Sequence, residues 1–164
     1  MADEPKTTVD KLITADFVIT MNPTYDIYTP GAVAVMGDSI VAAGPRDALL
    51  AAYAVKERVD AGNAVVMPGF VNTHGHAPMT LLRALVDDLR LDVWLMGYMM
   101  PVEANFVNPN FCWMGTQLAA AEMIRSGTTT FMDMYYFEEA VADAAVQAGM
   151  RAVCAQSVLR FPTP

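Results

Sequence analysis

The chain begins with short segments in which hydrophobic and polar residues alternate, a pattern typical of half-buried strands. Three such segments are predicted as strands, at residues 12–21, 32–36 and 39–43. Gly37-Asp38 lies between the last two and predicts a hairpin turn. An Ala- and Leu-rich stretch from Pro45 to Ala54 then predicts a short helix with Pro45 at its first position. We therefore expect residues 1–64 to form a small β domain.

The pattern changes near Val65, where predicted strands start to alternate with predicted helices. Strands are expected at residues 65–73, 128–135 and 152–159, the first of them interrupted at Pro68-Gly69. Helices are expected at residues 78–85, 91–100 and 138–148, together with one that starts at Pro109 and stops at Gly127.

Several helix boundaries are marked by individual residues. Asn108 is placed to cap the helix that starts at Pro109, and Phe111, Met114 and Leu118 recur along that helix at helical spacing. Gly127 and Gly149 are placed to end helices. Pro101 should stop or kink the helix that precedes it.

Strands alternating with helices indicate a parallel sheet with right-handed crossover helices. Both an open doubly wound sheet and a (β/α)₈ barrel start in this way, but a barrel needs about 250 residues and about eight strands. This chain has 164 residues. If the fold is a barrel, the chain is therefore its N-terminal part, and the last predicted strand pairs with a segment beyond Pro164.

Composition narrows the possible functions. Hydrophobic residues make up 54% of the chain and charged residues 17%, so much of it should be buried. A net charge of −8 and the lack of any Lys/Arg run argue against nucleic-acid binding. No apolar stretch reaches the roughly 18 to 20 residues of a membrane span, and the acidic start, Met1 to Lys6, lacks a secretory pattern. Cys112 and Cys154 are expected to be reduced packing residues, so we expect a cytoplasmic protein.

The candidate chemistry lies in a His-x-His sequence that holds the only two histidines of the chain, His74 and His76. Residues two apart on a strand point to the same face, so two imidazoles can reach one cation. Two unrelated surface histidines are the alternative. The pair follows a predicted strand, however, at the end where parallel α/β folds place their active sites.

The same region carries a family resemblance. The run MPGFVNTHGHAPMTLLR at residues 67–83 closely resembles the first barrel strand of the amidohydrolase superfamily. The match continues through Asp87-Asp88-Leu89, Trp94-Leu95, Pro101-Val102-Glu103, residues 126–130 and residues 132–135. It is most similar to the branch of methylthioadenosine and S-adenosylhomocysteine deaminases, with triazine hydrolases and guanine deaminases as more distant relatives.

That resemblance implies a fold and a metal site. Residues 1–64 would form the first half of a small β-sandwich, and residues 65–164 the first three β/α units of a TIM barrel. Family members bind one divalent metal, usually zinc, through the His-x-His, a further histidine and an aspartate. His74 and His76 would thus be two of the ligands, and the others would lie beyond residue 164. The metal would lower the pKa of a bound water so that hydroxide can attack a ring carbon that bears an amino group.

The resemblance also implies substrate contacts. Glu103 matches the family glutamate that accepts hydrogen bonds from ribose hydroxyls, for which a carboxylate offers two adjacent acceptors. An exposed helix-end glutamate is the alternative. Trp94 is a candidate for lining the adenine pocket, and ordinary helix packing with Leu91, Leu95 and Tyr98 is the alternative. Gln156 stands where we place a family arginine that meets the homocysteine carboxylate, which counts against S-adenosylhomocysteine.

Asp133 is a weaker candidate, at the end of the second predicted barrel strand. It could support the metal ligands, form a buried hydrogen bond, or cap the helix that follows. No acid–base catalyst is expected in this chain, because the family's proton-transferring glutamate and histidine would lie beyond residue 164.

The sequence therefore leaves three candidate functions. The first is a hydrolytic deaminase of adenine-type nucleosides such as methylthioadenosine, adenosine or S-adenosylhomocysteine, with the remaining C-terminal part of the barrel as its necessary partner. The second is a triazine chlorohydrolase or guanine-type amidohydrolase. The third is a non-catalytic fragment, since the chain by itself is expected to be inactive. The sequence leaves open whether the protein forms a homo-oligomer.

Overall fold

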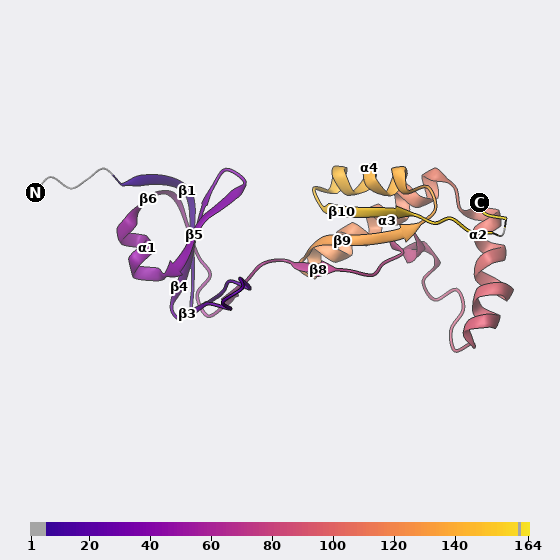
Figure 1. Ribbon diagram of the computed structural model, residues 1–164, viewed down its shortest axis with the longest axis horizontal. Helices are drawn as coiled ribbons and strands as arrows, with labels where there is room; N and C mark the ends of the chain where they lie inside the picture. The colour runs from indigo at the N-terminus through magenta and orange to yellow at the C-terminus, as the bar shows by residue number, and fades with distance from the viewer. Residues whose placement is uncertain (1–5, 161) are drawn as a thin grey trace, which may run out of the picture. The chain divides into compact units, whose positions relative to one another are not determined.

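A computed structural model describes residues 6–160 and 162–164 and divides into two compact units, Met1–Pro68 and Gly69–Pro164 (Figure 1). Residues 1–5, on which the absence of a secretory pattern partly rests, lie outside the described residues, as does Phe161. Within the described part of the chain, no helix combines the length and the apolar character needed to cross a membrane.

The described residues of the first unit form two sheets and one helix. The larger sheet has the order β5-β4-β1-β6 and the smaller one the order β3-β2-β7. The strands of the larger sheet are β1 (Thr7–Ala15), β4 (Gly31–Met36), β5 (Ser39–Pro45) and β6 (Tyr53–Asp60). Those of the smaller sheet are β2 (Phe17–Ile19), β3 (Ile27–Tyr28) and β7 (Val65–Val66), and the helix is α1 (Arg46–Ala52). A small aliphatic core is formed by Val9, Leu12, Ala32, Ala34 and Leu49.

One prediction for this unit was wrong: the expected strand at residues 12–21 is split at Asp16 into β1 and β2, which belong to different sheets. The predicted short helix is confirmed as α1, but Pro45 is its N-cap rather than its first residue. The helix ends at Ala52, and β6, which was not predicted, starts at Tyr53. β6 was missed because parallel pairing with the distant β1 holds it in place, and its burial shows no alternation that the sequence could reveal. The Gly37-Asp38 hairpin between β4 and β5 is confirmed.

The second unit contains a parallel sheet of order β10-β9-β8 (Figure 1). Its strands are β8 (Phe70–Asn72), β9 (Thr128–Tyr135) and β10 (Arg151–Gln156). Helix α3 (Pro109–Arg125) precedes β9 in the chain, and α4 (Glu138–Ala148) connects β9 to β10. The predicted strand at residues 65–73 is divided at Pro68-Gly69 between the two units, and the predicted third strand ends early, at Gln156.

Side chains of β9 point alternately to the two faces of this sheet. Phe131, Asp133 and Tyr135 are buried, and Phe131 and Tyr135 belong to a core formed with residues of α3 and α4. Met132 and Met134 are exposed on the other face. The helices therefore cover one face of the sheet in this chain.

Helix α3 uses small residues for its buried face: Cys112, Gly115, Thr116, Ala119 and Ala120. The larger Met114 and Leu118 are exposed, so their helical spacing marks the helix but not its buried side. A Cβ atom added at Gly115 would lie 2.4 Å from the Pro78 carbonyl oxygen. The absence of a side chain at residue 115 thus allows the segment after the histidines to pack closely on α3.

Three helical segments connect β8 to α3: the 3₁₀ helix η1 (Ala77–Leu82), the π-helix η2 (Val93–Met99) and α2 (Met100–Phe106). Pro101 does not end the helix, as one alternative predicted. It lies in the first turn of α2, where a missing N–H is tolerated, and the helix changes there from π to α geometry. The predicted cap at Asn108 is confirmed, since its side chain accepts a hydrogen bond from the Phe111 N–H at 3.0 Å. Gly127 and Gly149 follow α3 and α4 with left-handed φ values of 85° and 73°.

Candidate functional site

His74 and His76 lie in the loop that follows β8, and their ring centroids are 5.3 Å apart. Gly75 between them passes close to β9, because a Cβ atom there would lie 3.1 Å from the Met132 carbonyl oxygen. The structure therefore brings the two predicted ligands together, and glycine at residue 75 permits the close approach of the two backbones.

The end of β9 fixes this loop through three hydrogen bonds. The Met134 N–H donates to the Gly75 carbonyl at 3.2 Å, and the Ala77 N–H donates to the Asp133 carboxylate. The His76 ring donates from Nδ1 to the Met134 carbonyl at 2.6 Å. A carbonyl oxygen only accepts, so Nδ1 carries the proton and Nε2 keeps its lone pair in the neutral ring. This is the arrangement that orients a metal-binding histidine.

These donors fit part of a zinc-type site. Imidazole nitrogens suit zinc and other divalent transition metals, and a closed zinc site has about four ligands. Within residues 6–160 and 162–164, no group of three His, Cys, Asp or Glu side chains is placed to bind a metal. The chain thus offers two imidazoles, and any further ligands would have to come from elsewhere.

Glu103 lies on α2 and is only 6% exposed, which excludes the alternative of an exposed helix-end glutamate. The Tyr135 hydroxyl donates to Glu103 Oε1 at 2.8 Å, and the Tyr135 ring lies 6.4 Å from that of His76. Burial raises the pKa of Glu103, while the Tyr135 hydrogen bond and the nearby His76 lower it. Tyr135 thereby links the predicted substrate residue to the predicted metal ligand.

Asp133 and Glu138 form a second group of buried carboxyls, 0% and 5% exposed. Within the part of the chain that the structure describes, Asp133 Oδ2 and both carboxyl oxygens of Glu138 have no hydrogen-bond donor. Burial and the adjoining Asp133 charge raise the pKa of Glu138 to about 7, and burial raises the pKa of Asp133. A proton bound between the two carboxyls would relieve this repulsion.

The sequence predicted a role for Asp133 but not for the neighbouring buried carboxyl of Glu138. The N-cap of α4 is Phe137, so the capping role suggested for Asp133 is wrong, while a buried hydrogen-bonded aspartate is confirmed. Glu138 resembles an ordinary acidic residue in the first turn of a helix, and nothing in the sequence indicates its burial.

The other two candidates are Trp94 on η2 and Gln156 at the end of β10. Trp94 is half-buried on η2, while Leu91, Leu95 and Tyr98 are exposed, so the described residues supply no core packing for that predicted face. The Gln156 side-chain oxygen accepts from the Glu138 N–H at 3.2 Å. Gln156 therefore caps the start of α4.

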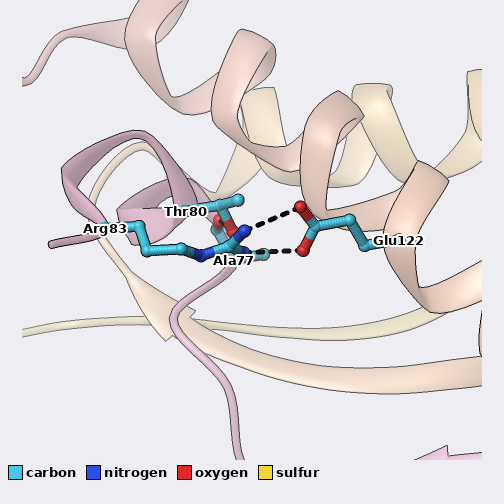
Figure 2. A network of polar contacts seen from close by, with 4 residues as sticks. All are labelled: Ala77, Thr80, Arg83 and Glu122. Carbon is cyan, nitrogen blue, oxygen red and sulfur yellow. Dashed lines mark hydrogen bonds and ion pairs between the residues drawn. The ribbon is translucent and has the colours of Figure 1, made fainter.

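A cavity of about 470 Å³ adjoins the histidine loop. Its walls include His76, Asn72 and Asp133 on the sheet side and Thr80 and Glu122 on the helix side. Arg83 donates two hydrogen bonds to the Glu122 carboxylate, at 2.9 and 2.6 Å, and so ties the end of η1 to α3 beside this cavity (Figure 2).

The two cysteines are free thiols. Burial raises the pKa of Cys112 to about 12 and that of Cys154 to about 11, so neither forms a reactive thiolate near neutral pH. Both pack in or against the core of the second unit, as predicted, and their reduced state remains a prediction.

The sequence of the chain is similar to that of known proteins. The family model described as the amidohydrolase family matches residues 65–162. A 5-methylthioadenosine/S-adenosylhomocysteine deaminase of Syntrophobacter fumaroxidans is 48% identical over 155 residues, covering 94% of this chain and 35% of that protein. A protein of the same name from Syntrophus aciditrophicus is 42% identical over 95% of this chain and 35% of its own length. The chain thus spans about a third of the length of these relatives.

The fold of the chain is similar to that of solved structures. A zinc-bound adenosine deaminase from Xanthomonas campestris matches with a TM-score of 0.90 and 40% identity, covering 97% of this chain and 36% of that one. A zinc-bound atrazine chlorohydrolase from Arthrobacter aurescens matches with a TM-score of 0.80 and 21% identity over 93% of this chain and 36% of its own. At that identity, the second match shows a shared fold only.

Proposed function

Because this chain belongs to the amidohydrolase family, we propose that it is the N-terminal part of a metal-dependent hydrolytic deaminase of adenine-type nucleosides. The family resemblance predicted from residues 67–83 is confirmed. The names of the similar proteins, methylthioadenosine/S-adenosylhomocysteine deaminase and adenosine deaminase, support an enzyme that hydrolyses a non-peptide C–N bond.

The proposed architecture is the first half of a β-sandwich at residues 1–64 and the first three β/α units of a barrel at residues 65–164. An exposed apolar sheet face supports it: Val71, Met132, Met134 and Val153 lie open on strands β8, β9 and β10. Parallel sheets are normally covered on both faces, so this face needs further residues to pack against it. The remaining two thirds of a relative's length would provide them.

We assign His74 and His76 as two ligands of one divalent metal. The zinc in the similar Xanthomonas protein supports zinc as that metal. When bound, such an ion lowers the pKa of a coordinated water toward neutrality. The Met134 carbonyl holds the proton of His76 on Nδ1 and so presents Nε2 as the ligand atom, while the Asp133 carboxylate holds the Ala77 N–H at the base of the loop.

The observation that carries this proposal is the set of contacts from His76 through Tyr135 to Glu103. These contacts support a role for the buried Glu103 carboxylate in accepting hydrogen bonds from the vicinal hydroxyls of a ribose. Trp94 is proposed to line the adenine pocket. The residues that transfer protons during hydrolysis are proposed to lie outside residues 1–164.

The direct test uses the full-length protein that contains this chain, loaded with zinc. Ammonia release should be measured with methylthioadenosine, adenosine and S-adenosylhomocysteine. We expect turnover of the first two to exceed that of S-adenosylhomocysteine, because the Gln156 amide cannot replace a guanidinium for a carboxylate. No turnover of any of the three would refute the proposed substrate class.

A triazine or guanine-type hydrolase is the second candidate, favoured by the shared fold of the chlorohydrolase. Glu103→Gln separates the two functions, because only a ribose-bearing substrate should lose activity strongly. Glu139→Gln is the control for the loss of a glutamate charge, since Glu139 is exposed on α4. Equal effects of the two substitutions on nucleoside turnover would count against a ribose-binding Glu103.

A third candidate is a non-catalytic fragment. It predicts that the 164-residue chain alone binds zinc weakly and releases no ammonia. Native mass spectrometry of the protein from its source would show whether a complementary polypeptide accompanies the chain. The cytoplasmic location remains a prediction.

A further inference from the structure

We propose that Tyr135 is a positioning residue that gives the site its preference for ribose-bearing substrates by fixing the orientation of the Glu103 carboxylate. This inference rests on the proposed function, because it concerns the same substrate pocket. It adds a residue that the sequence motifs alone did not single out.

Tyr135 is held rigidly at the end of β9. It is the last residue of β9, is 4% exposed, and packs its ring 4.9 Å from that of Tyr136. The residue before it, Met134, bonds the histidine loop through both its N–H and its carbonyl. The Tyr135 hydroxyl is therefore held in a fixed relation to the proposed metal ligands.

The orientation of the Glu103 carboxylate depends on the Tyr135 hydroxyl. Glu103 lies on α2, a helix of seven residues that continues from the largely exposed η2. Within residues 6–160 and 162–164, the Tyr135 hydroxyl is the hydrogen-bond donor recorded for the Glu103 carboxylate. Without that donor, the carboxylate would be buried with no fixed rotation.

The Glu103 carboxylate keeps acceptor sites for further hydrogen bonds. The Tyr135 phenol is the donor to Glu103 Oε1, because a carboxylate oxygen only accepts. Oε1 accepts this hydrogen bond with one lone pair and keeps another, while Oε2 keeps both. Two adjacent ribose hydroxyls can then each find an acceptor whose direction is already set.

The test is Tyr135→Phe in the zinc-loaded full-length enzyme, assayed with adenosine and with 2′,3′-dideoxyadenosine. Loss of a hydrogen bond to a charged group should lower kcat/KM for adenosine by about 10-fold, mainly through KM. The dideoxy substrate lacks both hydroxyls, so its kcat/KM should change much less. The ratio of the two values is the decisive readout, because a purely structural defect would lower both equally.

Tyr136→Phe is the matched control, since it removes a hydroxyl from the adjacent residue. Zinc content and Tm should be measured for both variants. An unchanged ratio in Tyr135→Phe, or the same shift in Tyr136→Phe, would overturn the inference while leaving the deaminase proposal intact. If the unaltered enzyme deaminates no nucleoside, the proposed function fails and this inference fails with it.

Discussion

The two units of the chain differ most in what they bury. The core of the first unit consists of aliphatic residues, and the buried polar side chain found there, Thr14, bonds to Asp60 at 3.1 Å. The second unit buries three carboxyl groups, those of Glu103, Asp133 and Glu138. Among the residues that the structure describes, the first unit thus buries no carboxyl group, while the second buries three.

That difference indicates where function lies. Burying a carboxyl group is costly unless it is paired or protonated, and fold stability alone gives no reason to collect three of them. Asp133 and Tyr135, which holds Glu103, lie at the C-terminal end of β9, beside the loop that carries His74 and His76. We interpret the first unit as a structural support and the second as the reactive part.

The largest effect on stability should come from the aliphatic core of the first unit. Leu12 is fully buried there, and Leu12→Ala should lower the free energy of unfolding by about 3 kcal/mol, since it leaves a cavity. Denaturant unfolding of the full-length protein would measure this. The kcat/KM of the folded variant should stay within about two-fold of the original, because Leu12 packs in a core formed by residues of the first unit and shares no partner with the proposed site residues. A much larger drop in kcat/KM would show that the first unit takes part in the reaction.

A close packing contact in the second unit should give the next largest effect. Gly115→Ala would place a Cβ atom 2.4 Å from the Pro78 carbonyl oxygen, a backbone atom that cannot rotate away. We expect a loss of about 2 kcal/mol and a lowered zinc affinity, since Pro78 follows the histidine loop closely. Gly97→Ala is the control, because among the described residues no atom outside its chain neighbours and its own helix backbone lies within 4 Å of the added Cβ. Equal stability of the two variants would contradict the packing described here.

The buried carboxyl pair predicts a pH dependence of stability. The pKa of Glu138 rises from 4.5 to about 7 in the folded protein. Its stabilising contribution is therefore complete below the lower value and is lost as the pH rises through the upper one. Glu138→Gln should remove this loss and be more stable at pH 8 by on the order of 1 kcal/mol. Unfolding curves between pH 4 and pH 8, with exposed Glu139→Gln as control, would measure it, and parallel curves for all three proteins would refute it.

The smallest effect should come from the exposed ion pair between Arg83 and Glu122 (Figure 2). Its side chains are 62% and 46% exposed, and water weakens such pairs. Glu122→Gln should shift Tm by no more than about 2 °C, and the difference should vanish at high salt. A larger shift that persists in salt would mean that this pair is as important as the buried carboxyls.

Parts of the fold could be predicted because local residues mark them. β9 and α4 were predicted with their observed bounds, since Gly127 and Gly149 fix the ends of the preceding elements. β6 was missed because a partner 46 residues away holds it, as in the pairing of Thr7 with Tyr53. The inner face of α3 was not evident, because its small residues pack and its large ones do not.

In the candidate site, too, only the residues marked by the local sequence could be predicted. The two histidines lie two residues apart in the sequence and were found from their spacing and family resemblance. Tyr135 and Glu138 were missed, because their significance depends on tertiary contacts: Tyr135 meets Glu103 from 32 residues away. Local sequence carries no signal for such a pairing.

The most direct test of the account is a crystal structure of the full-length protein with zinc, using anomalous scattering at the zinc edge to locate the metal. We expect one peak at about 2.0 to 2.1 Å from imidazole nitrogens of both His74 and His76, with Nε2 as the ligand atom of His76. Its Nδ1 should still donate to the Met134 carbonyl. A zinc peak away from both histidines, or one bound through Nδ1 of His76, would contradict the account.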